Sequence, residues 1–248
     1  MSAKSILGLF AATAALLLVG PHAAAQTSSG GWRFTIAPYL VGAAMDGTVG
    51  VKGQEVTLDV PFSDIWANLH FGGMVHFDMK NDRWLVSSDL IYMDLQQSTD
   101  VANGTAKATM TQTFVEVAGG YRVSNEFTVL AGARLVDLGG KLSFTGANAD
   151  RSGSQSKSWV DPFVGAQLNV ALSDHWWFDL HGDVGGFDVG SKLAWQAYAD
   201  IGYRASDLVS VYLGYRALDI DYESGSGSTL FRYDVLTAGP QIGVAFRF

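Results

Sequence analysis

Residues 241–248 read QIGVAFRF, the stretch that decides how the chain folds. Bulky apolar side chains at positions 242, 244, 246 and 248 alternate with small or polar ones. Alternation with a period of two places each set on its own face of an extended strand. We therefore predict a strand with one apolar face, and that face requires an apolar environment.

The same stretch resembles the C-terminal assembly signal of bacterial outer-membrane β-barrel proteins, in which a polar residue and a glycine precede two aromatic residues. Gln241, Gly243, Phe246 and Phe248 carry this resemblance. It implies that the barrel assembly machinery is a partner of the chain and that the chain inserts into the outer membrane.

The first 25 residues predict a secretory signal peptide. Lys4 supplies the basic start, residues 6–20 form an apolar run, and the small residues 23–25 offer a cleavage site. The apolar run is shorter than the ~20 residues of a membrane-spanning helix, so a retained anchor is the weaker alternative. We predict a signal peptide at 1–25 and a single outer-membrane β-barrel domain at 26–248.

Composition narrows the function classes. The net charge of −8 argues against nucleic-acid binding, which requires a basic surface. There is no cysteine, so disulfides and thiolate chemistry are excluded. Hydrophobic residues make up 48% of the chain, with 29 glycines and 14 phenylalanines but no second long apolar run. This mixture favours many strands over membrane-spanning helices.

About ten segments show period-two patterning, and the connections between them alternate in length. The segments are 32–44, 70–80, 84–95, 107–122, 127–138, 158–172, 176–185, 192–204, 208–221 and 232–248. Tight turns fall at 81–83, 124–126, 173–175 and 206–207, and longer connections at 45–69, 96–106, 139–157, 186–191 and 222–231. Short periplasmic turns alternating with longer external loops are typical of a transmembrane barrel.

The predicted fold is all-β: a transmembrane antiparallel up-and-down β-barrel of about ten strands. Eight or twelve strands are alternatives, because residues 48–60 have the pattern of an extra hairpin. Residues 62–69 are predicted to form a short helix near the barrel mouth. A soluble β-sandwich or lipocalin-like barrel, with its apolar face inward, is the alternative fold. It explains neither the terminal motif nor the alternating connections.

Charged residues of both signs fall on the predicted inward faces of the strands. The acids are Asp78, Asp89, Glu116, Asp161, Asp179, Asp183 and Asp200, and the bases are Arg33, Arg122, Arg134, Arg204, Arg216 and Arg247. Enclosed charges need partners, so we predict lumenal pairs such as Glu116 with Arg134 and Asp200 with Arg216. Together with Asp183, these residues are expected to close most of the lumen. The alternative is an eyelet that selects small solutes in a narrow channel.

One stretch, residues 179–183, carries the side chains of a general base. Asp179, His181 and Asp183 share a face, and an Asp-x-His pair resembles part of the omptin protease site. This pair lies close to the predicted periplasmic turn, whereas an omptin-like site lies at the external mouth. No His–Ser pattern suggests a lipid A deacylase or phospholipase. We therefore expect no enzymatic activity and no catalytic residues, with an outer-membrane hydrolase as the remaining alternative.

Metal binding has one candidate, the alternating carboxylates Asp219, Asp221 and Glu223 near the outer rim. A solvated rim explains them as well, and nothing in the sequence indicates a zinc, phosphate-loop or dinucleotide site. We expect no metal and no cofactor.

Beyond its last strand, the chain resembles a family of proteobacterial outer-membrane β-barrel proteins, in the small class that includes OmpA-, OmpX- and OmpW-like proteins. The stretches that carry the resemblance are 32–39, 62–66, 182–187, 214–216, 221–222 and 239–248. It implies the fold, the outer-membrane location and partners among outer-membrane lipids and lipopolysaccharide. It supplies no catalytic residue. A structural, envelope or surface-interaction role is the leading functional hypothesis, and a narrow channel for small solutes is the alternative.

Overall fold

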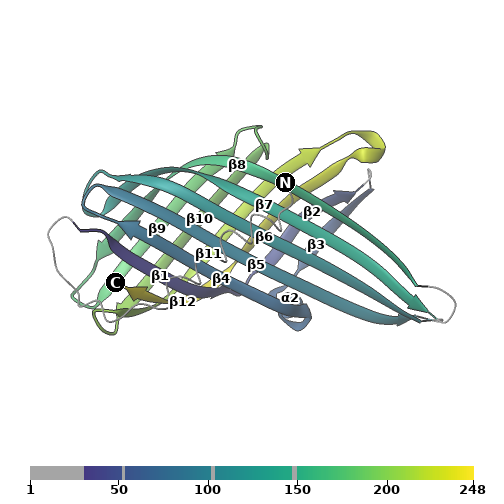
Figure 1. Cartoon of the computed structure of the whole chain (residues 1–248), viewed down its shortest axis with the longest axis horizontal. Coiled ribbons are helices and arrows are strands. Elements are labelled where there is room, and N and C mark those ends of the chain that lie inside the picture. Colours follow the sequence, from purple (N-terminus) through teal and green to yellow (C-terminus); the bar gives the residue numbers. More distant parts are fainter. Residues whose placement is uncertain (1–30, 52–53, 102–103, 147–149) are drawn as a thin grey trace. The chain divides into compact units, whose positions relative to one another are not determined.

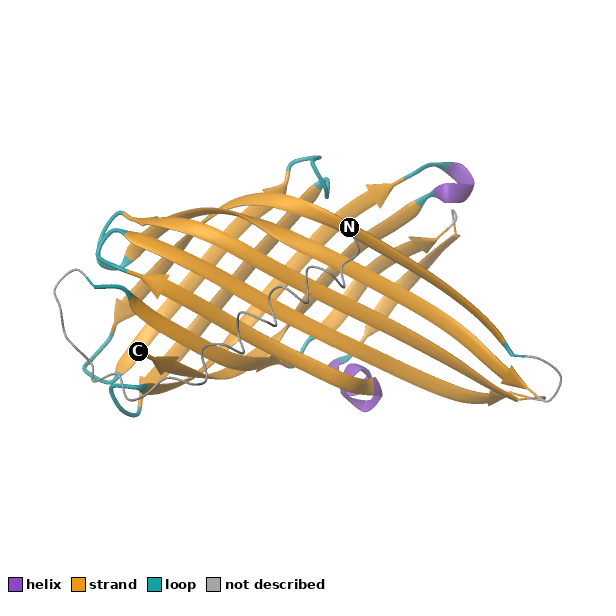
Figure 2. Cartoon of the chain, viewed as in Figure 1, coloured by secondary structure: helices purple, strands orange, loops and turns teal. Residues whose placement is uncertain are grey.

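The computed structural model describes residues 31–51, 54–101, 104–146 and 150–248. The predicted signal peptide lies outside these ranges. Most of the described chain is strand, with a short helix and a single 3-10 turn, as Figure 2 shows. The elements are β1 (Arg33–Val41), β2 (Ala44–Val51), β3 (Gln54–Val60), α2 (Phe62–Asn68), β4 (Leu69–Lys80), β5 (Trp84–Val101), β6 (Gly104–Arg122), β7 (Phe127–Gly146), β8 (Arg151–Ala171), β9 (Trp176–Gly186), β10 (Leu193–Arg204), β11 (Val209–Ser224), η1 (Gly227–Thr229) and β12 (Phe231–Arg247). None of the described helices is long and apolar enough to cross a membrane.

The strands form a closed wall (Figure 1). Each strand from β4 to β12 pairs antiparallel with the next, and β1 joins β4 to β12. The wall has ten strands, β1 and β4–β12, which confirms the predicted up-and-down barrel and its strand number. Four tight connections, residues 81–83, 123–126, 172–175 and 205–208, mark one end of the barrel, called the turn end below. The opposite end is called the loop end.

The extra hairpin extends the wall instead of widening it. Along β12, β1 pairs with residues 241–247 and β2 pairs with residues 231–238. The β2–β3 hairpin therefore continues the line of β1 and β4 at the loop end, and twelve strands are never closed into one ring. The helix predicted at 62–69 is present as α2, between β3 and β4.

Several strands are far longer than a membrane requires. β5–β8 contain 18 to 21 residues, whereas β9 and β10 contain 11 and 12, and a spanning strand needs only about 9–11. At the loop end the wall thus continues as two four-stranded sheets, β5–β8 and β11–β12–β2–β3. Much of 96–106 and 139–157, predicted as external loops, is strand. Their polar and glycine residues occupy both faces, so the sequence lacks the alternation that marks a strand.

The faces of the wall exchange polarity partway along the strands. On β11 near the turn end the outward side chains are apolar: Val211, Leu213 and Tyr215. Beyond Arg216 the order reverses, because Leu218 and Ile220 are buried inside the barrel while Asp219 faces outward. The barrel is therefore apolar outside near the turn end and apolar inside near the loop end. The inner apolar surface is removed from water by packing in the barrel interior, whereas the outer one needs an apolar environment around the barrel.

Candidate functional site

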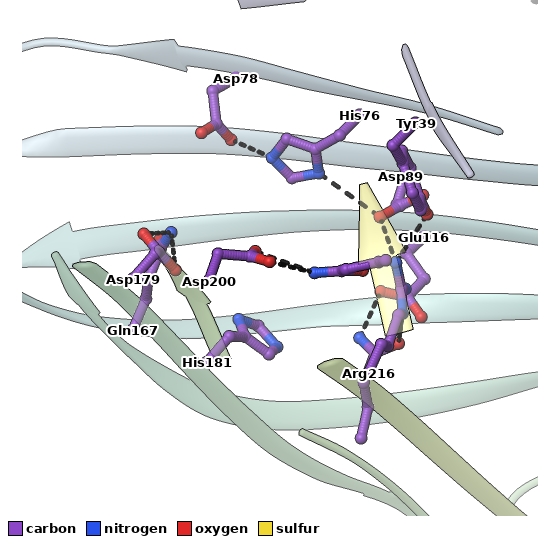
Figure 3. A network of polar contacts seen from close by, with 12 residues as sticks. Tyr39, His76, Asp78, Asp89, Glu116, Gln167, Asp179, His181, Asp200 and Arg216 are labelled. Carbon is purple, nitrogen blue, oxygen red and sulfur yellow. Dashed lines mark hydrogen bonds and ion pairs between the residues drawn. The ribbon is translucent and has the colours of Figure 1, made fainter. Parts of the chain in front are cut away.

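A polar network crosses the lumen above the turn end, and part of it is shown in Figure 3. Arg134 of β7 is fully buried; its Nε lies 2.6 Å from Oε1 of Glu116 on β6, and its Nη2 lies 2.8 Å from Oδ1 of Asp183 on β9. Gln196 of β10 donates to both carboxylates, at 3.2 and 3.3 Å. Four strands are joined across the lumen by this one cluster.

Arg216 of β11 is the centre of a second cluster. Its Nη1 lies 3.1 Å from Asp89 of β5 and donates to the hydroxyl of Tyr39 on β1 at 2.6 Å. Tyr39 in turn donates to Asp89 at 2.6 Å, and Nε of Arg216 donates to Gln196 at 2.9 Å. His76 of β4 bridges the cluster to the turn end, with one ring nitrogen 3.4 Å from Asp89 and the other 3.0 Å from Asp78.

The structure brings together only one of the two predicted charge pairs. Glu116 pairs with Arg134 as predicted, and Asp183 joins them. The predicted pair of Asp200 and Arg216 is wrong. Asp200 accepts two hydrogen bonds from Gln241 of β12, at 2.7 and 2.9 Å, while Arg216 pairs with Asp89. Because Asp200 lies opposite Gly214 on β11, the longer Arg216 side chain is free to cross the lumen.

Of the two carboxylates that share a face with His181, Asp183 is the one that contacts the imidazole. His181 lies 2.8 Å from Asp183, with its ring stacked on Tyr198 at 4.7 Å. Asp179 accepts hydrogen bonds from Gln167 and Asn169 instead. His181 is therefore held in place by a carboxylate on its own strand and by a ring on β10.

A polar cavity of about 110 Å³ lies below these clusters, near the turn end. Asp179 and Asp200 face each other across neighbouring strands in its wall. Lys80, Arg247 and Trp177 line it as well. Tyr198 and the buried Arg216 line it too, and a second, smaller cavity of about 20 Å³ shares His76, Asp89, Gln167 and Tyr198 with it.

An apolar core fills the lumen toward the loop end. Its buried members come from α2, from β10 and from both loop-end sheets: Met45, Ile65, Met93, Phe114, Val136, Leu138, Trp159, Ala194, Leu218, Ile220, Tyr222, Phe231, Tyr233 and Val235. Trp159 of β8 stacks on Tyr222 of β11, with ring centroids 3.8 Å apart. The sequence reasoning missed this core, although the reversed alternation of 216–223 is its signal.

The terminal motif has distinct structural roles. Gln241 faces the lumen and holds Asp200, whereas Phe246 and Phe248 are exposed on the outside. Gly243 leaves room for the ring of Tyr212 on β11, which a Cβ atom would overlap. The rim carboxylates are separate from this region: Glu223 pairs with Lys192 at 2.7 Å. Among the described residues no three metal-binding side chains gather.

Comparison with known proteins adds the following. No protein-family model and no curated protein matches the chain. Among solved structures it is similar to Ail, the attachment invasion locus protein of Yersinia pestis, with 13% identity, a TM-score of 0.41, and coverage of 88% of this chain and 99% of that one. The outer membrane protease OmpT from Escherichia coli (8%, 0.46, 92% and 99%) and Neisserial surface protein A (11%, 0.34, 88% and 99%) are further neighbours. These neighbours are outer-membrane β-barrel proteins, and at such identities the likeness concerns the fold alone.

Proposed function

We propose that the protein is an integral outer-membrane protein whose lumen stays closed and whose loop end has a structural or surface-interaction role. In this orientation the turn end faces the periplasm, and the two projecting sheets face outward. Outer-membrane lipids, lipopolysaccharide and the barrel assembly machinery are its expected partners. The role requires no catalysis.

The height of the apolar outer belt supports the membrane location. On β12 the outward apolar side chains run from Leu236 to Phe246, and Asp234 lies just beyond Leu236. Ten steps of about 3.3 Å along a strand tilted by about 45° correspond to a height of about 23 Å. Transmembrane barrels have an apolar band about 25 Å tall. The ring of ladders from β1 to β12 is also closed, so each strand of the wall has a paired neighbour on either side, as lipid requires.

The side chains that cross the lumen are the observation that carries the proposal. A solute that left the cavity would first meet Arg216 and Arg134, each held by carboxylates from other strands. It would then meet the apolar core, which offers an ion no replacement for its water. Two different barriers therefore lie in series along the same axis.

Planar-bilayer recording of the purified mature protein tests this proposal. We expect no unitary current steps at constant voltage. Stable steps of one size would contradict the closed lumen and favour the narrow channel.

A hydrolase assay tests the non-enzymatic part of the proposal. We expect no turnover of peptides or lipid A. Turnover that His181→Ala abolishes, and that the matched change His175→Ala in an exposed turn leaves intact, would assign an enzymatic role instead.

A further inference from the structure

The loop-end wall has a slot between β3 and β5. The β4–β5 ladder stops at the pair Leu69–Leu95, and residues 96–101 of β5 pair only with β6. On the other side of the slot, β3 pairs only with β2. Two strand edges with unpaired backbone groups therefore border the slot within the described chain.

The slot arises because α2 is inserted between β3 and β4, which would otherwise form one strand. Tyr39 pairs with Met74 in the β1–β4 ladder, whereas Met45 pairs with Val60 in the β2–β3 ladder. The two registers differ by eight residues, which are residues 61–68 with α2 among them. β3 thus occupies the place where β4 would have continued. If the register of the last β4–β5 pair, Leu69 with Leu95, continued into β3, Val60 would lie opposite Gln96. No ladder joins these two residues.

The apolar core is incompletely covered on this side. Seven partly buried hydrophobic residues pack against it, and all belong to β2–β6: Val49, Leu58, Val60, Leu69, Ile91, Leu95 and Met110. The contributions of β7, β8 and β10–β12 are all buried. Val56, on the same face of β3 as Leu58, is 62% exposed. The interior of the loop-end sheets therefore reaches the surface at the slot.

The base of the slot is continuous with the outer apolar belt. Trp66 of α2 is 60% exposed, and its ring lies 5.9 Å from that of Phe62. Phe71 of β4 is equally exposed and lies 5.9 Å from Tyr92 of β5. Exposed aromatic side chains of this kind are typical of the interface between a barrel and lipid headgroups. The slot opens directly above them, since Leu95 follows Tyr92 by three residues.

We propose that this slot binds an acyl chain of an outer-leaflet lipid. The acyl chain passes α2 and lies on Leu95, Met110 and Leu58, while the lipid headgroup stays in the aqueous layer beside the projecting sheets. Moving the acyl chain from the leaflet onto these side chains exchanges one apolar environment for another, and it covers apolar surface that otherwise contacts water. The proposal goes beyond the closed lumen and does not depend on it, because the slot opens through the side of the wall.

Photolabelling tests the proposal with the full mature chain in vesicles of phosphatidylethanolamine and phosphatidylglycerol. The probe is a phosphatidylcholine with a diazirine near the end of one acyl chain. We expect peptide mapping to find label on the inward-facing residues Leu58, Val60 and Met110, in addition to the outer belt. Label confined to outward belt residues such as Leu213 and Ile242 would overturn the proposal.

Paired variants on one strand separate binding from folding. Met110→Glu places a charge in the slot, and inward label should fall about tenfold because a chain cannot cover an unpaired carboxylate cheaply. Thr109→Glu adds the same charge on the opposite face of β6 and should leave inward label unchanged. Heat-dependent migration on gels reports whether each variant is folded. If Met110→Glu does not fold, Leu58→Asn and its neighbour Thr57→Asn serve as the second pair.

Two other occupants are distinguished in the same preparation. Label from a free fatty acid probe without label from the phospholipid would exclude the leaflet as the source and overturn the proposal. Slow amide exchange along β3, together with a cross-linked dimer of a Glu55→Cys variant, would show that a strand of a second copy fills the slot, and would overturn it as well. Bilayer conductance is a separate measurement, so failure of the closed lumen and failure of the slot are told apart.

Discussion

Removing the Arg134 guanidinium should be the most destabilising single change in the lower lumen. In Arg134→Ala both ion pairs are lost. The buried carboxylates of Glu116 and Asp183 then repel each other without the guanidinium between them. Breaking a buried pair costs about 3–5 kcal/mol. Gln196 still donates to both carboxylates and His181 still contacts Asp183, so we expect the lower end, about 3 kcal/mol.

Urea unfolding in detergent micelles, followed by tryptophan fluorescence, measures this loss. With a urea m-value of about 3 kcal/mol per M, the midpoint should fall by about 1 M. Arg122→Ala is the matched control, because the Arg122 guanidinium donates to the carbonyls of Asn81 and Asn125 near a turn, and its loss should cost about 1 kcal/mol. Adding Glu116→Gln to Arg134→Ala should recover part of the loss. Equal midpoints for Arg134→Ala and Arg122→Ala would refute the reasoning.

Three further changes test other parts of the barrel. Gly243→Val should prevent folding, scored by heat-dependent gel migration, because its side chain overlaps a tyrosine on β11, whereas Gly119→Val meets open space and should fold. Trp159→Ala should lower the unfolding free energy by about 3–5 kcal/mol, because it removes a buried side chain from the apolar core. Leu142 is 64% exposed, so Leu142→Ala should lower it by less than about 1 kcal/mol. Similar losses in the two variants would contradict the assignment of Trp159 to a packed core. Lys192→Ala should change urea stability by less than about 1 kcal/mol, since its ion pair is exposed, and a larger loss would show that the loop it anchors is part of the folded core.

The sequence predicts the turn-end part of the wall well because two faces with different surroundings impose a strict period. In β12, Ile242 and Phe246 must face outward while Gln241 faces the lumen, and the alternation states this directly. The tight turns follow from the same pattern, since they interrupt it. Strand number and topology depend on these two signals alone.

The loop-end sheets are harder to predict because their polarity is inverted and their outer faces contact water. Leu218 and Ile220 alternate with Asp219 as regularly as the residues below Arg216 do, but with the opposite assignment of faces. A search for strands whose apolar side chains face outward therefore ends each strand at the residue where the apolar side chains change to the inner face. The level at which the phase reverses is itself a sequence signal for the boundary of the apolar belt.

The partners of the lumenal charges depend on distances across the barrel, which adjacency in sequence does not give. Glu116 and Arg134 are directly opposite on neighbouring strands, so their pairing follows from register. Arg216 and Asp89 are on strands that are not neighbours in the wall, and only the closed barrel brings them within 3.1 Å. Side-chain length decides such contacts, because an arginine crosses a narrow lumen and an aspartate does not.

The position of the slot follows from the same physics that closes the barrel. Within the belt every strand edge must be paired, because lipid offers no partner to a backbone N–H or C=O group. The β1–β4 ladder stops at Tyr39 and Met74, whereas the β4–β5 ladder continues, across a β-bulge, to Leu69 and Leu95, just above Phe71 and Tyr92. Beyond that level water satisfies an open edge, so an eight-residue insertion can displace β3 without the cost it would have lower down. A break in the wall is therefore tolerated at this height, and in the proposed orientation an outer-leaflet lipid can reach it.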